Sequence, residues 1–461
     1  MTFEVISPVD GSVYYTGKLQ GIDAVNTTLE NAKKAQKNWA STPLVKRQEL
    51  VASMVQNLVD MREEIGTEIS WQMGRPESQA KNEPLGFEER ALYLSSVAKE
   101  ALEPIRPEQE ENFDLYMAKD PLGTVAILSP WNYPYLTTSN VLASALLAGN
   151  TVILKHSLQT PLVANRMKTA SEMAGFPEGV FQVLHISHAD TGAMVADARI
   201  DGVFFTGSVE GGRRVQEALT DKFIPCGLEL GGKDPAYVTA SADVDFAVEN
   251  LVDGAFFNSG QSCCGIERIY VHENLYDDFI AKFAELTKNY KLGNPFDSET
   301  NIGPMVKVAS ADYVRKQISD AVAQGAKSLV DESLFPASKV GTAYLSPHVL
   351  VDVTHDMSVM REESFGPVIG IMKVSSDAEA IALMNDSDLG LTASVWSEDV
   401  DGAYGICEEI KTGTVFVNRC DYLHPKLAWT GVKNTGRGIS LSKQAFDQVT
   451  RIKSYHIRTK R

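Results

Sequence analysis

The spacing of apolar residues along this chain changes near Pro121. Before that point, residues 24–40 and 43–61 carry apolar side chains at helical spacing, with charged side chains on the opposite face. This pattern predicts two amphipathic helices within a mainly helical N-terminal part. Beyond Pro121, short apolar runs alternate with segments of helical length, an alternation typical of parallel α/β sheets.

The elements predicted beyond this change are bounded by turn residues. Strands are expected at residues 124–128, 151–154, 180–185, 201–206, 236–238, 268–272 and 414–418, and helices at residues 137–147 and 209–219. Residues 112–118 alternate apolar and polar side chains as an exposed strand does, and residues 452–457 form a regular strand pattern. A regular exposed strand generally pairs with another, in this chain or in a second subunit.

Residues 121–154 contain no charged side chain, a property that membrane helices share with buried sheets. Prolines at 130 and 134 and a Gly-Asn pair at 149–150 interrupt this segment. A strand, a loop, a helix and a second strand fit between these interruptions, and a parallel βαβ unit is apolar because both faces of its sheet are covered. We therefore assign the segment to a buried core and expect no membrane partner.

Composition narrows the class of protein. The chain has 461 residues, 44% hydrophobic and 22% charged, which corresponds to roughly two to four globular domains. A net charge of −17 argues against nucleic acid or an anionic membrane as the main partner. The five cysteines are sparse and form no C-x-x-C pair, which favours free thiols in a reducing compartment. Residues 1–11 lack a signal-peptide pattern, so we expect a soluble cytoplasmic protein.

A pair of thiols lies between two glycines in the segment Gly-Gln-Ser-Cys-Cys-Gly at residues 260–265. A thiolate attacks carbonyl carbons well, and the pKa of a thiol falls in a field of aligned backbone amides. Free cysteines are also among the most frequently buried residues. From this segment alone, two small core side chains remain the alternative to a catalytic thiol.

Glu229 lies between two leucines at an expected strand end and is followed by two glycines and Lys233. A carboxyl in apolar surroundings has a raised pKa and can act as a general base. A solvated carboxylate in a turn is the alternative.

Asn132 lies in the loop Pro-Trp-Asn-Tyr-Pro at residues 130–134. Two prolines stiffen this loop, and a rigidly held amide is a good hydrogen-bond donor to a developing oxyanion. An ordinary turn asparagine beside aromatic core neighbours explains the same pattern.

Two further segments are weaker signals. Glycines follow the expected strand at 201–206 and open a helix, an arrangement that suits a phosphate at the helix N-terminus. Their spacing departs from G-x-G-x-x-G, which makes them a weak dinucleotide signal. The segment Glu-Glu-Ser-Phe-Gly-Pro at residues 362–367 fits either ribose and ring binding or a helix-to-loop transition around a buried phenylalanine.

These five segments occur in the order found in the aldehyde dehydrogenase superfamily, which the sequence resembles over essentially its whole length, from Ser-Pro-Val-Asp-Gly at residues 7–11 to the terminal strand. The resemblance implies an α/β fold with a Rossmann-like cofactor domain, an α/β catalytic domain and a small β extension for oligomerisation. It places the cofactor domain at residues 1–105 and 122–231, the catalytic domain at 232–440, and the extension at 106–121 and 441–461. A homodimer or homotetramer is the implied assembly.

The resemblance also implies roles for the polar residues of the stronger segments. Cys263, two places after the glutamine of Gly-Gln-x-Cys, corresponds to the nucleophile, and Cys264 to a non-essential neighbour. Asn132 corresponds to the oxyanion donor, and Glu229 to the base that activates water to hydrolyse a thioester on Cys263. The implied reaction oxidises a small-molecule aldehyde to an acid with NAD or NADP, and no metal ligands are assigned.

A further set of residues is implied to bind the cofactor. Lys155 corresponds to a lysine at the adenosine ribose, Ser208 to a pyrophosphate contact, and Glu363 with Phe365 to the pair that positions the nicotinamide ribose and ring. The full set is Trp131, Lys155, Ser157, Gly207, Ser208, Gly212, Leu230, Glu363 and Phe365.

One departure from the family pattern bears on the cofactor. Where the family commonly has Lys-Pro-Ser-Glu, this chain has Lys-His-Ser-Leu at residues 155–158. The acid that is missing at Leu158 would repel the 2′-phosphate of NADP, whereas Lys155 and His156 are electrostatically compatible with it. We therefore expect use of both NAD and NADP, with an exposed loop imidazole as the alternative reading of His156.

A second departure lies in residues 418–433, whose first part aligns with the substrate mouth. Arg419 and His424 lie there, and cations at the mouth fit an aldehyde with an anionic tail, such as a semialdehyde. The Lys-His variant and the short chain resemble short succinate-semialdehyde dehydrogenases. A surface position for Arg419, or a pair with Asp421, is the alternative.

Two other functions stay open from the sequence. A semialdehyde dehydrogenase that transfers the acyl group to coenzyme A is disfavoured by Glu229, because such relatives tend to lack this base. A structural or binding relative without activity is disfavoured by the intact set of Cys263, Glu229 and Asn132.

Overall fold

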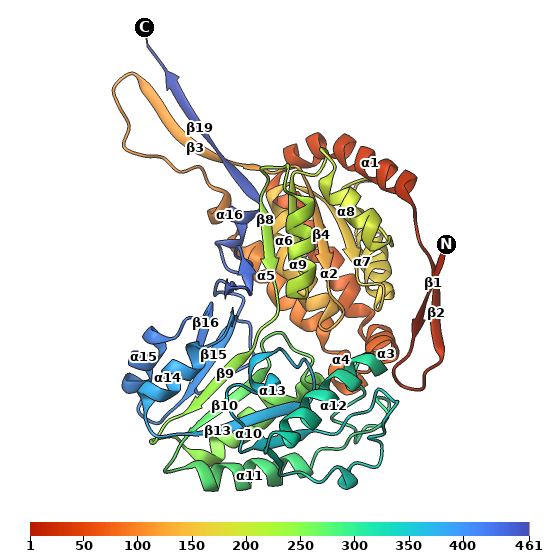
Figure 1. The fold of residues 1–461 in the computed structure, drawn as a ribbon. Helices are drawn as coiled ribbons and strands as arrows, with labels where there is room; N and C mark the ends of the chain where they lie inside the picture. The colour runs from red at the N-terminus through yellow and green to blue at the C-terminus, as the bar shows by residue number, and fades with distance from the viewer. Residues whose placement is uncertain (461) are drawn as a thin grey trace.

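A computed structural model describes residues 1–460 of the chain (Figure 1). Two large sheets lie one above the other, each with helices packed against it, and a two-stranded sheet projects from the upper half. Most strand pairs within the two large sheets are parallel. The α/β fold class expected from the sequence is confirmed.

The chain begins with a β-hairpin and a group of helices. These are β1 (Thr2–Ile6), β2 (Val13–Lys18), α1 (Ile22–Ser41), α2 (Leu44–Asp60), α3 (Arg62–Met73), α4 (Glu77–Ala80) and α5 (Glu83–Leu102). The two amphipathic helices expected from the sequence correspond to α1 and α2. The apolar pattern does not predict the hairpin, because each of its strands buries a single residue, Val5 or Gly17.

The first large sheet has the strand order β18-β8-β7-β4-β5-β6 and is parallel except at β18. Its strands are β4 (Thr124–Ser129), β5 (Thr151–His156), β6 (Phe181–Val183), β7 (Gly202–Thr206), β8 (Cys226–Glu229) and β18 (Gly436–Arg437). The helices that connect its strands are α6 (Pro134–Ala148), α7 (Pro161–Met173), α8 (His188–Ala196) and α9 (Val209–Ala218). A segment from near the end of the chain therefore completes this sheet.

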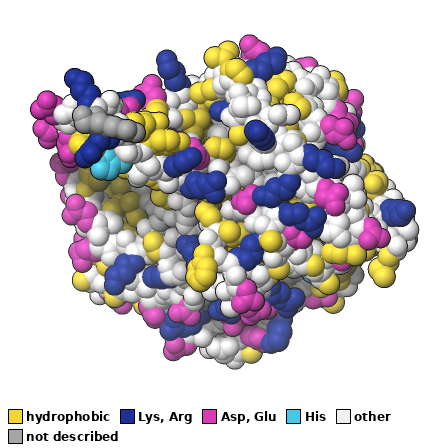
Figure 2. All heavy atoms as spheres, turned by 90° about the horizontal axis from the view of Figure 1, so that it is seen from above, with side chains coloured by type: hydrophobic (Ala, Val, Ile, Leu, Met, Phe, Trp, Pro, Cys, Tyr) yellow, Lys and Arg dark blue, Asp and Glu magenta, His cyan; other side chains and the backbone are white. Residues whose placement is uncertain are grey.

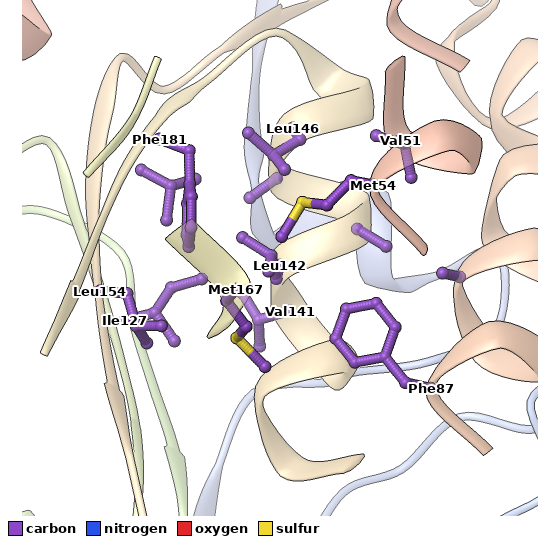
Figure 3. Packing of buried hydrophobic residues seen from close by; sticks show 14 of the residues in the cluster. Val51, Met54, Phe87, Ile127, Val141, Leu142, Leu146, Leu154, Met167 and Phe181 are labelled. Carbon is purple, nitrogen blue, oxygen red and sulfur yellow. The ribbon is translucent and has the colours of Figure 1, made fainter. Parts of the chain in front are cut away.

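Helix α6 is the centre of the core in this half. Nearly all of its residues are buried, because the sheet covers one side and α2 and α5 cover the other (Figure 3). Leu142 and Leu146 of α6 face Met54 on one side and Phe181 on the other. Burial on all sides explains why residues 121–154 carry no charge. Within residues 1–460, no helix is both long and apolar enough to cross a membrane.

The second large sheet has the strand order β11-β12-β13-β10-β9-β15-β16 and is parallel except at β11. Its strands are β9 (Asp234–Val238), β10 (Ile266–His272), β11 (Lys327–Ser328), β12 (His348–Val351), β13 (Val368–Val374), β15 (Thr392–Trp396) and β16 (Thr414–Val417). Its helices are α10 (Val244–Phe256), α11 (Tyr276–Lys288), α12 (Val308–Ala323), α13 (Ser358–Arg361), α14 (Asp377–Asn385) and α15 (Val400–Glu409), with short 3-10 turns η1 (Phe257–Gly260) and η2 (Glu332–Leu334).

The projecting sheet pairs β3 (Phe113–Pro121) with β19 (Thr450–Arg458) in antiparallel register (Figure 1). The exposed strand and the terminal strand expected from the sequence thus pair with each other in one chain. The rings of Tyr116 and Tyr455 stack across the pair with centroids 4.4 Å apart. The remaining short elements are α16 (Ala445–Gln448), which packs against β19, and the separate strand pair β14 (Leu389–Gly390) with β17 (Val432–Lys433). Residue 461, which the sequence assigns to this extension, lies outside the described residues.

The face that contains the projecting sheet carries a mixture of charges. Figure 2 shows Lys and Arg side chains interspersed with Asp and Glu, and with scattered apolar side chains between them. A mixed face of this kind produces little net field for steering a polyanion.

Candidate active site

Cys263 follows a tight turn that joins α10 to β10. The turn contains three consecutive residues with positive φ: Asn258 at 53°, Ser259 at 58° and Gly260 at 70°. Residues other than glycine seldom adopt this backbone conformation. Gln261 holds the turn in place: its Oε1 accepts the Val306 N–H at 2.8 Å, and its Nε2 donates to the Asn258 carbonyl at 3.2 Å. The backbone that carries the thiol is therefore fixed by side-chain contacts.

The two neighbouring thiols have different surroundings. Cys264 is 3% exposed, and its Sγ donates to Asp421 Oδ1 at 3.0 Å. Contact with the Cys263 thiol, and then burial, raises the pKa of Cys264 well above its usual value. Cys263 is half-buried and lines a cavity of about 350 Å³. Thiolate formation is thus disfavoured at Cys264, and Cys263 is the more accessible of the pair.

Glu229 ends strand β8 and lines the same cavity as Cys263. Its carboxylate accepts hydrogen bonds from Ser440 Oγ, from Thr206 Oγ1 at 3.2 Å and from Asn140 Nδ2 at 3.3 Å. Burial raises the pKa of Glu229, and these hydrogen bonds oppose the rise. The raised pKa agrees with the expectation from the sequence, but polar donors surround the carboxyl in addition to the apolar neighbours that its flanking leucines indicated.

Asn132 lies in the loop before α6 and is 4% exposed. Its Nδ2 donates to the backbone carbonyl of Gln261 at 3.2 Å, two residues before the thiol. The side chain does not line the Cys263 cavity directly. An amide carries two donor hydrogens, so this contact leaves one of them for an oxyanion.

A buried ion pair that the sequence analysis missed fixes the Asn132 loop. Arg75 Nη1 donates to Glu83 Oε2 at 2.7 Å, and both side chains are 2% exposed or less. Arg75 also donates to the Asn132 backbone carbonyl and, through Nε, to Asn258 Oδ1 at 3.1 Å. Glu83 Oε1 accepts the Tyr135 N–H at 2.8 Å, at the start of α6. Arg75 thereby ties the oxyanion candidate to the turn before the thiol.

Replacing Arg75 with methionine is expected to lower stability markedly. Glu83 would be left as an uncompensated buried carboxyl, and breaking a buried pair in this way typically costs about 3–5 kcal/mol. Thermal unfolding monitored by circular dichroism measures the effect. Arg106→Met is the matched control, because the pair between Arg106 and Asp114 is largely exposed and should contribute little. Equal melting temperatures for the two variants would contradict this role of Arg75.

Two glycines bring three motifs together beside the thiol. A side chain at Gly232 would place its Cβ 2.5 Å from the carbonyl oxygen of Cys263, and one at Gly231 would overlap the carboxylate of Glu363. The Gly232 N–H donates to Glu363 Oε1 at 3.0 Å. Burial raises the pKa of Glu363. The Gly-Gly turn after Glu229 therefore lets that segment pass against both other segments.

A second buried ion pair holds the segment that follows Glu363. Lys233 Nζ lies 2.6 Å from Glu267 Oε2, and both side chains are nearly inaccessible. Glu267 accepts the backbone N–H groups of Ser364 and Phe365, each at 2.8 Å. Glu267 is a residue that no local sequence signal identified.

A second cavity of about 510 Å³ adjoins the first, and Thr206 lines both. Of the cofactor residues expected from the sequence, it contains Trp131, Lys155, Ser157, Gly207 and Ser208. Ser208 caps helix α9 by accepting the Gly211 N–H at 3.1 Å. The loop between β7 and α9 thus places glycines and a helix N-terminus against this cavity.

The other four expected cofactor residues lie elsewhere, in three places. Glu363 and Phe365 line a third cavity of about 400 Å³, which shares Trp131 with the second, and the Trp131 and Phe365 rings lie 5.6 Å apart. Gly212 does not line the second cavity, because it packs against the side chain of Leu230, where an added Cβ would lie 2.7 Å away.

Leu230 itself lines the Cys263 cavity and not the second one. The position of Gly212 is explained by helix-to-strand packing alone. Gly211, which the sequence analysis did not single out, is the glycine of this helix that faces the cavity.

His156 corrects an expectation about the cofactor. It is the last residue of β5 and is fully buried, with Nε2 3.3 Å from the Pro134 carbonyl and Nδ1 3.3 Å from Thr160 Oγ1. Burial lowers the pKa of His156 to about 4, so the ring is neutral at pH 7. Both readings from the sequence are therefore wrong: His156 is neither an exposed loop imidazole nor a cation for a 2′-phosphate.

The two residues expected at the substrate mouth do not line the Cys263 cavity. Arg419 is exposed and lies over the Tyr422 ring, with its guanidinium carbon 3.7 Å from the centroid, and it does not pair with Asp421. His424 packs edge-on against the same ring at 6.0 Å. The loop that carries them does reach the cavity, through residues 420–423. The lining of this cavity therefore gives no support to a contact between these two side chains and a substrate tail.

Fold and site together define an α/β enzyme in which a thiol and a carboxyl share one cavity beside a larger, glycine-lined one. The chain belongs to the aldehyde dehydrogenase family, whose sequence profile matches residues 1–455. It is 34% identical over 458 residues to an aldehyde dehydrogenase of Paenarthrobacter nicotinovorans, covering 98% of this chain and 99% of that relative. A succinate-semialdehyde dehydrogenase [NADP(+)] of Mycobacterium avium is 32% identical, over 96% of this chain and 94% of its own.

Solved structures agree with this membership. An NAD-dependent aldehyde dehydrogenase from Sinorhizobium meliloti superposes with a TM-score of 0.96 at 31% identity, covering 100% of this chain and 92% of that one. The resemblance inferred from the five sequence segments is confirmed. The chain is an aldehyde oxidoreductase.

Proposed function

We propose that this enzyme oxidises an aldehyde to the free carboxylic acid with NAD or NADP through a covalent intermediate on Cys263. The observation that carries the proposal is the shared cavity, in which Cys263 and Glu229 face the same space. A thiol gives a good nucleophile for a carbonyl, and a carboxyl of raised pKa gives a base for water.

The first half of the reaction uses Cys263 and Asn132. The Cys263 thiolate adds to the aldehyde carbon and produces an alkoxide. The free hydrogen of the Asn132 amide and a backbone N–H stabilise that charge, an effect typically worth about a hundred- to a thousandfold in rate for each donor. When bound, the nicotinamide cofactor accepts the hydride. The carbon then remains attached to Cys263 as a thioester.

The second half uses Glu229. Its carboxylate takes a proton from water, the water oxygen attacks the thioester carbon, and the Cys263 sulfur leaves as the acid is released. Ser440, Thr206 and Asn140 hold the carboxylate through hydrogen bonds, so its orientation is fixed before water arrives. Hydrolysis to a free acid needs a base that activates water, whereas transfer of the acyl group to coenzyme A does not. The presence of Glu229 therefore favours a free acid as the product.

The second cavity fits a dinucleotide. Lys155 lines it, is 8% exposed, and has no carboxylate within ion-pair distance among residues 1–460. Burial lowers the pKa of Lys155 to about 8, and an anionic ligand would favour its charged form. Gly207, Ser208 and Gly211 line the cavity at the start of α9, and a helix N-terminus is a favourable place for phosphate oxygens.

The division into domains follows from the same assignment. We propose residues 1–105 and 122–231, around the first sheet, as the cofactor domain, and residues 232–440 as the catalytic domain. The pairing of Gly436 and Arg437 with β8 ties the end of the second unit to the first. Residues 106–121 and 441–461 form the proposed oligomerisation element of a homodimer or homotetramer, which light scattering would measure.

The proposed function is tested with a panel of aldehydes, by following the absorbance of the reduced nicotinamide cofactor. Turnover with at least one aldehyde and a free acid in the product are expected. Dependence on added coenzyme A would identify an acyl-transferring enzyme instead. Cofactor binding without turnover of any aldehyde would indicate a binding protein.

Both cofactors are expected to support turnover. Glu210 is the carboxylate among the lining residues of the second cavity, and it pairs with Arg214 at 3.1 Å. Lys155 and Arg214 lie where the cavity would hold the adenosine end, and neither repels a 2′-phosphate. Steady-state kinetics should give kcat/KM values for NAD and NADP within about a hundredfold of each other, which is about 2.7 kcal/mol. Strict rejection of NADP would contradict this expectation.

A further inference from the structure

Arg90 is a buried cation in the Cys263 cavity, and neither the sequence motifs nor the proposed reaction uses it. It lies on helix α5, is 8% exposed, and is the basic side chain among the described lining residues. Among residues 1–460, no carboxylate oxygen lies within 4.0 Å of its nitrogens. Glu83, at the start of the same helix, pairs with Arg75 instead.

The hydrogen bonds of Arg90 leave most of its donors unused. Nη1 donates to the Leu136 carbonyl at 2.9 Å and to Asn140 Oδ1 at 2.7 Å. Nε and Nη2 carry three further hydrogens, which have no acceptor among the described residues and are not sealed from the cavity. The contacts to α6 therefore fix the plane of the guanidinium and leave one of its edges free.

Burial of the Arg90 guanidinium is unfavourable, because desolvation of its charge outweighs the attraction of nearby acidic groups such as Glu229 and Glu83, neither of which forms an ion pair with it. A planar pair of oxygens on a ligand would use the free edge, since arginine matches carboxylate geometry with two parallel hydrogen bonds.

Four acidic residues also line the cavity: Glu89 and Asp253 are exposed, whereas Glu229 and Asp421 are half-buried. Hydrogen bonds from Ser440, Thr206 and Asn140 hold Glu229, and hydrogen bonds from Ser262 and Cys264 hold Asp421. The two exposed carboxylates lie in contact with water. Water screens the attraction between an exposed carboxylate and Arg90 more strongly than the attraction between Arg90 and an anion in direct contact with it.

We propose that Arg90 binds a carboxylate at the far end of the aldehyde, so that the preferred substrates are oxo-carboxylic acids, the semialdehyde class. The inference rests on the proposed function and assigns the recognition of the anionic tail to α5 instead of the loop that carries Arg419. Arg419 is exposed and already stacked on Tyr422, so it offers no desolvated site. The terminal amide of Asn140 accepts from Arg90 through Oδ1 and donates to Glu229 through Nδ2, so a single amide group separates the tail site from the water-activating base.

The test compares two four-carbon aldehydes, succinate semialdehyde and butanal, which differ in the terminal carboxylate. In the unaltered enzyme, kcat/KM is expected to favour the carboxylated aldehyde. In Arg90→Gln, the ratio of the two kcat/KM values is expected to fall by about a hundredfold, the size of a lost charge-assisted pair. Arg90→Lys should restore part of the ratio, because charge remains and the paired geometry is lost.

Arg419→Gln is the matched control, since it removes the same charge from the cavity's outer loop. A fall in the ratio for Arg419→Gln and none for Arg90→Gln would overturn the proposal in favour of the loop. An equal loss for both aldehydes in Arg90→Gln would also overturn it, because that result describes a positioning residue that acts through Asn140 on Glu229. Circular dichroism melting shows that each variant is folded.

A second measurement does not depend on turnover. Succinate, and not the uncharged butanamide, is expected to protect Cys263 from alkylation by iodoacetamide, and Arg90→Gln should abolish that protection. Protection in an enzyme that oxidises no aldehyde would refute the proposed function and keep the carboxylate site. Turnover of butanal equal to that of succinate semialdehyde, without protection by succinate, would keep the function and refute the carboxylate site.

Discussion

Replacing Cys263 with serine is expected to lower aldehyde oxidation by about 10⁴-fold or more, because the enzyme loses its nucleophile. A hydroxyl is almost entirely protonated at neutral pH and is then a much weaker nucleophile for a carbonyl than a thiolate. Formation of reduced nicotinamide cofactor at saturating aldehyde measures the loss. Intact-mass spectrometry should in parallel detect no acyl adduct on the variant.

Cys264→Ser is the matched control for this experiment. The two thiols are adjacent, but the Cys264 sulfur donates to Asp421 and is 3% exposed. A serine hydroxyl can donate to the same carboxylate, so activity should stay within about tenfold of the unaltered enzyme. Loss of activity in Cys264→Ser but not in Cys263→Ser would identify Cys264 as the nucleophile. Full activity in both variants would show that neither thiol is the nucleophile.

Replacing Glu229 with glutamine is expected to stop the reaction after hydride transfer. The amide keeps the size of the side chain but cannot take a proton from water, and loss of a general base typically lowers a rate by about 10²- to 10⁴-fold. Rapid mixing should then show one burst of reduced cofactor per site followed by slow turnover. The thioester on Cys263 should accumulate and be visible by mass spectrometry.

The pH dependence of hydrolysis gives an independent readout for Glu229. Burial raises its pKa, and the base works only when it is ionised. Turnover should therefore increase with pH up to this raised pKa, and the increase should disappear in Glu229→Gln. Glu89→Gln is the control, because Glu89 lines the same cavity and is exposed. Unchanged steady turnover in Glu229→Gln would assign the water-activating role to another group.

The sequence predicts the fold well where apolar runs are long or strongly periodic. Residues 121–154 illustrate this, since Pro130, Pro134 and Gly149 mark the ends of β4, α6 and β5 within a few residues. The hairpin of β1 and β2 was missed because its strands bury too few side chains to leave a period. The sequence did not predict β13, because its residues form a continuous apolar run that contains Gly370. Such a run is compatible with a strand and with a buried helix alike.

The candidate site divides in the same way. Cys263, Glu229 and Asn132 lie in local motifs, and the order of these motifs along the chain was enough to identify the three residues. Their proximity in the folded protein could not be predicted from their spacing in the sequence. Arg75 and Arg90 lie on or beside an early helical segment and carry no motif. They become recognisable only because the fold places Arg75 against the Asn132 loop and Arg90 against α6, both more than forty residues later in the chain. Burial, and not composition, distinguishes them from the other arginines.

The pairing of β3 with β19 has a consequence for how the molecule is assembled during synthesis. Strand β3 leaves the ribosome early, and its partner at residues 450–458 is made among the last. The same delay applies to β8, whose outer edge waits for Gly436 and Arg437. A nascent chain therefore carries two unpaired strand edges for most of its translation, the kind of surface that aggregates with other chains. Late closure of these edges makes the yield of folded enzyme depend on chaperones that shield nascent strands and on the speed at which the final segment is translated.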